Sequence, residues 1–540
     1  MTGRAREARG GRPGERPATA ALDGPLALWP LLERRAAATP DAPFAVDEAG
    51  RRLSFAGYRD AALRAAAGLA ARGVGEGTPV SWQLPTRLEA LVLLAALARL
   101  GAVQNPVLPF LRAREVGFVA RQSGARLLVV PSRFRGFDHA AMAREVAASV
   151  PGLQVLVVDG ALPEGDPAAL PRAPAPPRPA QATAEGPVRW VFYSSGTTAD
   201  PKGARHTDAS VGAAGRALVE ALALRPDDRN ALVFPLTHVG GVCWLFAGLL
   251  AGFAQIAVEV FDAKATVPVL AAHGATLAGA GTVFHQAYLA LQRASAAPIL
   301  PRVRAFPGGG APKPPGLHAA MKAAFGGAGV VAGYGLTEHP IATMGSVFDP
   351  DEKLAASEGR ATRDTELRVV RLRDGRPAAP GEEGEIRVRG PHLFRGYVDA
   401  ALDAEAFDEG GFFRTGDLGH LDGEGYLVVT GRLKDVIIRK GENLSAKEIE
   451  DHLAAHPKVR DVAVVGLPDA ERGERACAVV ACADPASPLG FDEMAAFLRG
   501  RGLAAQKIPE QLEVVAELPR NASGKVLKRD LRERYAERRS

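Results

Sequence analysis

The sequence has few cysteines, no long apolar run and no strong excess of one charge. Its three cysteines, Cys243, Cys477 and Cys482, fall among 540 residues with no metal-type spacing. A secreted domain held together by disulfides would carry a denser set. We also find no secretory signal. Together these absences predict a protein of the reducing cytoplasm.

The longest apolar stretch, residues 242–254, contains glycine and is shorter than the roughly 20 apolar residues of a membrane-spanning helix. It predicts a buried helix and no membrane span. Cys243 lies within this stretch. A nucleophilic role for its thiol is the alternative, but a cysteine in an apolar run usually packs as a small hydrophobic side chain.

The charge balance is close to even. There are 66 Lys and Arg residues against 61 Asp and Glu, which gives a net charge of +5 and a pI of about 9.1. Residues 1–24 hold part of the excess and lack hydrophobic periodicity, so we predict a disordered tail. A transit peptide is the alternative, against which Glu7 and Glu15 argue. Without an aromatic–basic recognition motif, the sequence predicts no nucleic-acid partner.

The chain is long enough for more than one domain. Its 540 residues are 47% hydrophobic and 24% charged, which allows large cores. Residues 171–179 form a Pro/Ala run that predicts a polyproline-like surface connection. Residues 188–192, which are β-branched and aromatic, predict a short buried strand after it.

The most informative segment follows that strand. Residues 193–203 are rich in hydroxyls and glycine and end with a lysine and a glycine. Glycine lets backbone N–H groups approach an anion, hydroxyls donate hydrogen bonds, and an ammonium offsets the charge of a polyphosphate. The spacing is not that of a Walker A motif, and a flexible polar loop is the alternative interpretation. The candidate phosphate-binding residues are Ser194, Ser195, Gly196, Thr197, Thr198 and Lys202.

Residues 193–203 resemble the signature of the adenylate-forming superfamily, which includes acyl-CoA synthetases, firefly-type luciferases and the adenylation domains of peptide synthetases. Ala199 stands where that signature usually has glycine. Further matching segments follow in the family's order, at residues 333–338, 415–417 with 431–432, 434–443 and 518–525. The resemblance covers nearly the whole chain after residue 25 and implies ATP, Mg²⁺ and CoA as cofactor and co-substrates.

The resemblance also implies roles for individual residues. Tyr334 would stack on adenine, Thr337 would contact the α-phosphate, and Glu338 with Thr198 would hold Mg²⁺. A carboxylate and phosphate oxygens are the ligands that this hard cation prefers. Taken alone, residues 333–338 predict an ordinary strand and turn.

By the same resemblance, Asp417 binds the ribose hydroxyls and Lys525 is the adenylation lysine. Arg432 would bind ribose or phosphate as a fixed charge. Taken alone, residues 415–432 predict a hairpin with glycine-rich turns, and a single lysine on a turn is usually a solvated surface charge.

A small α/β unit is predicted to begin near residue 434, because Ser445 and Glu448 have the spacing of a capping box. The resemblance places a hinge at Lys434 and puts Gly441 beside a pantetheine tunnel after rotation of a lid. We therefore predict an α/β fold with a tail at residues 1–24, a large multi-subdomain N-terminal α/β domain at 25–432, and a small mobile α+β lid domain at 433–540.

The acyl substrate is less determined. His238 matches a position that gates the acyl pocket in acyl-CoA synthetases, although a structural histidine is the alternative. Gly309, Gly310 and Ala311 match a segment along adenine and the acyl group. Amino-acid-activating relatives carry an aspartate in the region that corresponds to His238, and this sequence has none there. Its absence favours a fatty or alicyclic acid with an uncharged chain over an amino acid. Residues 105–109 and 134–137 resemble bacterial short- and medium-chain or alicyclic acyl-CoA ligases.

A carboxylate is a poor acyl electrophile, and adenylation by ATP removes that barrier. The predicted activity is formation of acyl-AMP and transfer of the acyl group to CoA, which releases AMP and pyrophosphate. Positioning and charge at the α-phosphate would carry catalysis without a protein nucleophile. The alternatives are a ligase that loads a carrier-protein pantetheine, a luciferase-like monooxygenase and a non-catalytic nucleotide sensor. Both a monomer and a homodimer are compatible with the sequence.

Overall fold

The structure is a computed structural model of the 540-residue chain. It describes residues 24–174, 186–194, 201–311, 313–314, 316–439, 442–469, 471–520 and 525–536. The predicted tail, apart from Gly24, therefore lies outside the described residues, as does the proline-rich run beyond residue 174.

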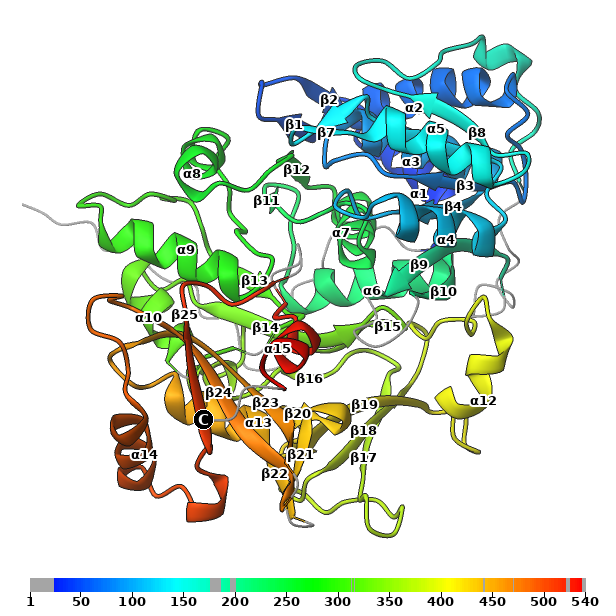
Figure 1. The fold of residues 1–540 in the computed structure, drawn as a ribbon. Coiled ribbons are helices and arrows are strands. Elements are labelled where there is room, and N and C mark those ends of the chain that lie inside the picture. The colour runs from blue at the N-terminus through cyan, green and yellow to red at the C-terminus, as the bar shows by residue number, and fades with distance from the viewer. Residues whose placement is uncertain are drawn as a thin grey trace, which may run out of the picture.

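The first part of the chain forms a mostly parallel sheet with the strand order β10-β9-β4-β3-β5-β8 (Figure 1). Alternate residues of β5 enter different cores: Leu127 and Val129 pack with α2 and α3, and Leu128 and Val130 pack with α4 and α5. This period of two is expected for a strand covered by helices on both faces. The elements are α1 Leu28–Ala38, α2 Phe55–Ala70, β3 Pro79–Trp82, α3 Leu88–Leu100, β4 Val103–Pro106, α4 Ala113–Ser123, β5 Leu127–Val130, α5 His139–Ser149, β8 Gln154–Val157, η1 Pro167–Ala169, β9 Val188–Ser194 and β10 Lys202–Thr207.

A small hairpin joins β5 to α5 within the segment that resembles bacterial acyl-CoA ligases. It consists of β6 Arg133–Phe134 and β7 Phe137–Asp138. Arg135 and Gly136 between them have φ values of 50° and 78°. Two successive left-handed residues make the tight turn that a two-residue hairpin requires.

Two further sheets lie beside the first. Their strand orders are β11-β12-β1-β2 and β13-β14-β15-β16. The predicted buried helix over residues 242–254 is confirmed as α7 up to Ala251, after which Gly252 ends the helix and Ala254 begins β12. Cys243 is fully buried in this helix, and burial raises the pKa of its thiol. The elements are β1 Pro43–Asp47, β2 Arg52–Ser54, α6 Asp208–Ala221, β11 Arg229–Leu232, α7 Val239–Ala251, β12 Ala254–Ala257, α8 Ala263–Ala272, α9 Thr282–Arg293, β13 Phe306–Gly308, α10 Leu317–Ala324, β14 Val330–Leu336, β15 His339–Met344, α11 Asp351–Ala356 and β16 Arg360–Ala361.

An antiparallel sheet of order β17-β18-β19-β20 follows and ends at Arg432. The short helix η4 Leu433–Asp435 then leads into β21 of the last sheet. The predicted domain boundary thus falls between two sheets. The elements of the antiparallel sheet and its connections are β17 Glu366–Val370, β18 Gly384–Arg389, η3 Ala400–Leu402, α12 Asp403–Ala406, β19 Phe413–Leu421 and β20 Leu427–Arg432.

The C-terminal part has a sheet of order β22-β21-β24-β23, with β25 paired to β24. Its helix α13 begins as predicted, because the Ser445 side chain accepts a hydrogen bond from the Glu448 N–H at 3.2 Å. The prediction of a full capping box was wrong, because the Glu448 carboxylate does not return to the Ser445 backbone and instead pairs with Lys507 at 2.7 Å. The elements are β21 Val436–Arg439, β22 Glu442–Ser445, α13 Ala446–Leu453, β23 Val459–Asp469, β24 Gly473–Cys482, α14 Phe491–Gly500, η5 Ala505–Lys507, β25 Gln511–Val515 and α15 Lys528–Tyr535.

The predicted fold class is confirmed: a large N-terminal α/β part precedes a smaller C-terminal α+β part. Figure 1 shows the helix α15 in red, and its Leu531 and Tyr535 pack with Ala463 and Val465 of β23. Across the described ranges, we find no helix with the length and apolar character needed to cross a bilayer.

Candidate active site

Thr337 and Glu338 lie at the tip of a tight hairpin. β14 ends just before them and β15 begins just after them, with Leu336 and His339 paired across the two strands. Residues 333–338 are therefore the strand and turn that the segment predicts on its own. The turn also places the two adjacent candidate residues, Thr337 and Glu338, at one point.

Glu338 is buried, with 9% of its surface exposed. The Tyr397 phenol donates a hydrogen bond to its Oε1 at 2.7 Å, and the Phe394 N–H donates to its carbonyl oxygen at 2.9 Å. Burial raises the pKa of the Glu338 carboxyl, while the hydrogen bond from Tyr397 acts in the opposite direction. A cation beside this carboxylate would favour its ionised form.

The Thr337 backbone is held by His206 of β10. The Nε2 atom of His206 lies 2.9 Å from the carbonyl oxygen of Thr337, and Nδ1 lies 2.9 Å from the Ser210 hydroxyl. Because a carbonyl only accepts, Nε2 carries the proton. Burial lowers the pKa of His206 to about 4, so the ring is neutral near pH 7.

Asp417 and Arg432 are direct partners across the β19–β20 hairpin. Their side chains form an ion pair of 2.7 Å, and the phenol of Tyr334 donates to the other Asp417 oxygen at 2.7 Å. The hairpin that residues 415–432 predict on their own is therefore confirmed, and the ribose-binding role of Asp417 stays a prediction. Since each carboxylate oxygen has two lone-pair positions, Asp417 keeps acceptor capacity for a diol.

Residues 309–311 run close to β14. A Cβ at Gly309 would lie 2.8 Å from the carbonyl oxygen of Gly333, and Gly310 has a φ of 74°. Both positions favour glycine, the first through close approach and the second through backbone conformation. The loop is fastened beyond these residues, because the Lys313 ammonium donates to the carbonyl oxygen of Ser357 at 3.0 Å.

A cavity of about 360 Å³ lies between the large part and the C-terminal part. It brings together side chains from β14, β19, β20, η4 and the segment before α15. The predicted site residues that line it are Gly310, Ala311, Tyr334, Asp417, Arg432, Lys434 and Lys525. Helix α15 adds basic residues at the same cavity: Lys528, Arg529 and Arg532.

Lys525 is half-buried in the wall of this cavity. Burial, together with the charges of Arg432 and Lys434, lowers the pKa of its ammonium to about 8, while Asp417 and Asp435 act in the opposite direction. Burial also lowers the pKa of Lys434, and Arg432 adds to that effect. These three cations, together with the basic residues of α15, favour an anionic ligand.

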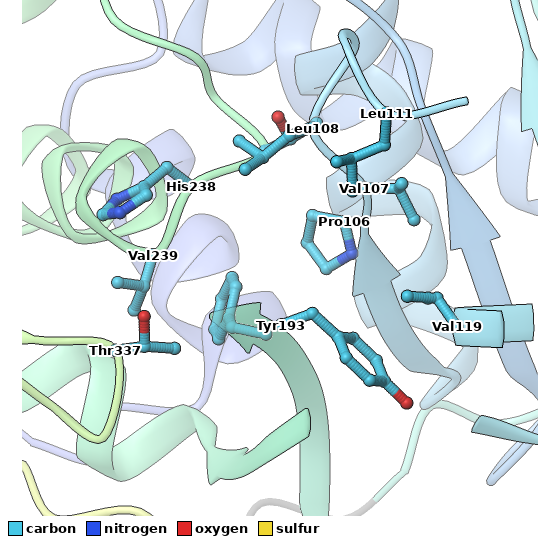
Figure 2. Close-up of a pocket in the computed structure, with 11 residues that line it drawn as sticks. Pro106, Val107, Leu108, Leu111, Val119, Tyr193, His238, Val239 and Thr337 are labelled. Carbon is cyan, nitrogen blue, oxygen red and sulfur yellow. The ribbon is translucent and has the colours of Figure 1, made fainter. Parts of the chain in front are cut away.

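A second, much smaller cavity of about 20 Å³ lies next to the hairpin tip. Figure 2 shows His238 and Thr337 on one side and Pro106, Leu111 and Val119 on the other. The lining is mostly apolar, and the free volume is that of about one water molecule. The residues that line it are Pro106, Val107, Leu108, Leu111, Val119, Phe192, Tyr193, Thr237, His238, Val239 and Thr337.

His238 has a structural contact as well as a place in this cavity. It is the N-cap residue of α7, and its Nδ1 accepts a hydrogen bond from the Gly240 N–H at 3.0 Å. Its ring packs edge-on against Phe234, with centroids 4.8 Å apart. Burial lowers the pKa of His238 to about 4, so this ring is also neutral near pH 7.

The predicted phosphate loop is described only at its ends. Ser194 ends β9 and Lys202 begins β10, and these two residues are paired across the strands. The two ends of the loop therefore lie side by side on neighbouring strands. Ser195, Gly196, Thr197 and Thr198 lie outside the described residues, as do Ala199 and Gly441.

Two residues of this site were missed by the sequence interpretation. Tyr397 reaches Glu338 across 59 positions of sequence, and His206 reaches Thr337 across 131 positions. Neither residue type nor spacing signals these contacts locally. They arise because β10, the β14–β15 hairpin and residues 394–398 pack together.

Glu338 is the candidate metal ligand that the structure describes at this site. Among the residues that the structure describes, no group of three or more His, Cys, Asp or Glu side chains is arranged to hold a metal ion. A single buried carboxylate, Glu338, fits Mg²⁺ that is bound mainly through phosphate oxygens and water, as this cation often is. Thr198, the second predicted metal ligand, lies outside the described residues.

Sequence and structure comparisons place this geometry among known proteins. A medium-chain fatty-acid–CoA ligase of Escherichia coli (strain K12) is 32% identical over 515 residues, covering 94% of this chain and 90% of that protein. A salicyl-AMP ligase/salicyl-S-ArCP synthetase of Mycobacterium tuberculosis is 36% identical over 505 residues, covering 90% of this chain and 86% of that protein.

The fold agrees with a solved structure of an ATP-bound relative, MatB from Rhodopseudomonas palustris. The TM-score is 0.84 with 29% identity, and the match covers 95% of this chain and 99% of MatB. Residues 32–398 match the AMP-binding enzyme family, and residues 448–525 match the C-terminal domain of AMP-binding enzymes. Both parts of the chain that frame the large cavity are thus accounted for by one family, and the chain belongs to the AMP-binding enzymes.

Proposed function

We propose that this chain is an ATP-dependent acid–thiol ligase that converts a carboxylic acid to acyl-AMP and then transfers the acyl group to CoA. The observation that carries the proposal is the large cavity, in which Tyr334, Asp417, Arg432 and Lys525 meet from segments far apart in the sequence. A non-catalytic nucleotide sensor would need the first three residues but not the lysine.

In the first half-reaction, a carboxylate oxygen of the acid attacks the α-phosphorus of ATP and pyrophosphate leaves. We assign Tyr334 to adenine and Asp417 with Arg432 to the ribose side. Lys525 and the Thr337 hydroxyl stabilise the charge that develops at the α-phosphate, where fixed charges contribute most. Glu338, together with Thr198, would hold the Mg²⁺ that neutralises the phosphates.

The structure supports the adenylating arrangement, because Lys525 of the C-terminal part lines the same cavity as Tyr334 and Asp417. A contact across the proposed hinge accompanies it: the Ser445 hydroxyl donates to the Thr430 carbonyl oxygen at 3.0 Å. We propose that rotation about Lys434 breaks such contacts, withdraws Lys525 and brings the loop at Gly441 to the adenylate. The thiol sulfur then attacks the acyl carbon, and AMP leaves.

The acyl chain would lie at the small cavity beside Thr337 and His238, whose walls would have to move apart to admit it. The mostly apolar lining supports a fatty, alicyclic or aromatic acid. A carrier-protein pantetheine is the second candidate acceptor, because the salicyl-AMP ligase/salicyl-S-ArCP synthetase is a relative at 36% identity. The partners would otherwise be small molecules in the cytoplasm.

A panel of carboxylic acids tests the function directly. AMP release would be measured with ATP and Mg²⁺ for aliphatic, alicyclic and aromatic acids, first with CoA and then with a phosphopantetheinylated carrier protein. We expect AMP release that requires both an acid and CoA. AMP release that depends on the carrier protein instead of CoA would favour the second candidate. If none of the acids in the panel caused AMP release, the proposal would be contradicted.

Replacing Glu338 by Gln tests the metal assignment. The change keeps the shape of the side chain but removes the charge proposed to attract Mg²⁺. We expect the Mg²⁺ concentration for half-maximal pyrophosphate exchange at saturating ATP to rise by about tenfold or more. A Mg²⁺ titration that superimposes on the wild-type curve would assign Glu338 to structure alone.

The pH dependence of adenylation should report Lys525. Its pKa of about 8 in the free protein means that the ammonium is present below this pH and is lost as the pH rises through it. We expect kcat/KM for ATP in pyrophosphate exchange to fall above about pH 8, because kcat/KM reports groups of the free enzyme. In Lys525→Arg, which stays protonated, that falling limb should disappear; a limb that stays in place would belong to another group.

A further inference from the structure

Tyr397 is a buried phenol between two candidate site residues, with 4% of its surface exposed. Its hydroxyl donates to Glu338 Oε1 at 2.7 Å. The Lys202 ammonium, from the end of the phosphate loop, lies over the same ring at 5.5 Å from the centroid. One side chain therefore contacts both the proposed metal carboxylate and the proposed phosphate-binding cation.

The backbone around Tyr397 is fixed to both of these elements. On the side of β10, the Val398 N–H donates to the Gly203 carbonyl oxygen at 2.8 Å, and the Arg395 N–H donates to that of Arg205 at 2.7 Å. On the side of the hairpin tip, the Phe394 N–H donates to the Glu338 carbonyl oxygen at 2.9 Å. Residues 394–398 thus join the strand after the phosphate loop to the turn that carries Glu338.

The packing around the ring leaves it little freedom. Tyr397 belongs to a buried cluster with Phe394 and Phe413, and it meets the Phe394 ring edge-on with centroids 4.8 Å apart. A rigid ring places its hydroxyl at one point. A carboxylate that accepts a hydrogen bond from such a point is restricted to one orientation, whereas a free glutamate samples several rotamers.

We propose that Tyr397 is a positioning residue: it holds one oxygen of the Glu338 carboxylate so that the other faces a divalent cation on the ATP phosphates, and its ring seats the Lys202 ammonium beside them. This proposal rests on the proposed function, which supplies the nucleotide and the cation. Partners that orient a metal-binding side chain typically contribute tenfold or more to metal affinity.

The test is Tyr397→Phe, which removes the hydroxyl but keeps the ring over Lys202 and within its aromatic cluster. Binding of Mn²⁺ to the protein–ATP complex would be titrated by electron paramagnetic resonance without any acid, so that no turnover contributes. We expect Mn²⁺ affinity to fall about tenfold. ATP affinity measured calorimetrically in EDTA should stay at the wild-type value.

Tyr426→Phe is the matched control. Tyr426 is equally buried, with 2% exposure, and its hydroxyl donates to the Asp349 carboxylate at 2.9 Å, outside both cavities. We expect this variant to bind Mn²⁺ and ATP as the wild type does. A second measurement repeats Tyr397→Phe in a Glu338→Gln background, where it should have no further effect on Mn²⁺ binding, because the hydroxyl acts through the carboxylate.

Unchanged Mn²⁺ affinity in Tyr397→Phe would overturn the proposal. An equal loss of ATP affinity with and without the metal would also overturn it, because that result would mean that the substitution disturbs the whole site. Additive effects of the two substitutions would show that Tyr397 acts independently of Glu338. A wild-type protein that binds no ATP with Mn²⁺ would overturn the proposed function itself, and this proposal with it.

Discussion

Lys525→Ala is expected to abolish most of the adenylation activity while ATP still binds. The ammonium lines the cavity with Tyr334, Asp417 and Arg432, which would keep adenine and ribose in place without it. Its charge is needed most when charge develops at the α-phosphate, so the loss falls on the transition state. We expect the rate of pyrophosphate exchange to drop by about 10²- to 10³-fold, the cost of removing one preorganised donor.

The second half-reaction separates this role from a structural one. Synthetic acyl-adenylate and CoA would be supplied to the variant, and acyl-CoA formation would be measured. We expect this rate to stay near that of the wild type, because Lys525 is withdrawn in the proposed thiolation arrangement. A loss as large as that of adenylation would show that the assigned role is wrong.

Lys434→Pro is expected to leave adenylation largely intact while it impairs transfer of the acyl group to CoA. Lys434 lies in η4, between the last strand of one sheet and the first strand of the next. Proline is compatible with the φ of a short helix, and its ring fixes φ near that value. The substitution would therefore keep the present orientation of the C-terminal part and restrict its rotation about residue 434. We expect pyrophosphate exchange to persist and acyl-CoA formation from preformed adenylate to fall by about 10²-fold, since a misplaced acceptor site costs that much.

Lys434→Ala is the control for the lost ammonium, because Lys434 also lines the large cavity. Alanine removes the charge without restricting the backbone, so effects common to both variants belong to the side chain. Circular dichroism would verify folding. An equal loss of both half-reactions in a folded Lys434→Pro protein would place the hinge elsewhere or show that no rotation is needed.

Several elements could be predicted because their signals are local. The apolar run that becomes α7 buries Cys243, and the Ser445 side chain caps α13 through an N–H three residues away. The β19–β20 hairpin places Asp417 opposite Arg432, as its glycine-rich turns suggest. The capping box was wrong in its second half because Lys507, distant in sequence, offers Glu448 a full charge instead of a backbone N–H.

The sequence by itself determined the family, the reaction class and the residue types at the candidate site. Short contiguous motifs such as residues 193–203 and 333–338 require particular side chains at fixed spacing, so they can be recognised without the fold. Only the tertiary structure decided how those motifs support one another. The bonds from Tyr397 to Glu338 and from His206 to Thr337, and the place of Lys525 beside Asp417, join segments that no periodicity links. Such contacts depend on how sheets and hairpins pack, and their energies appear only once the chain is folded.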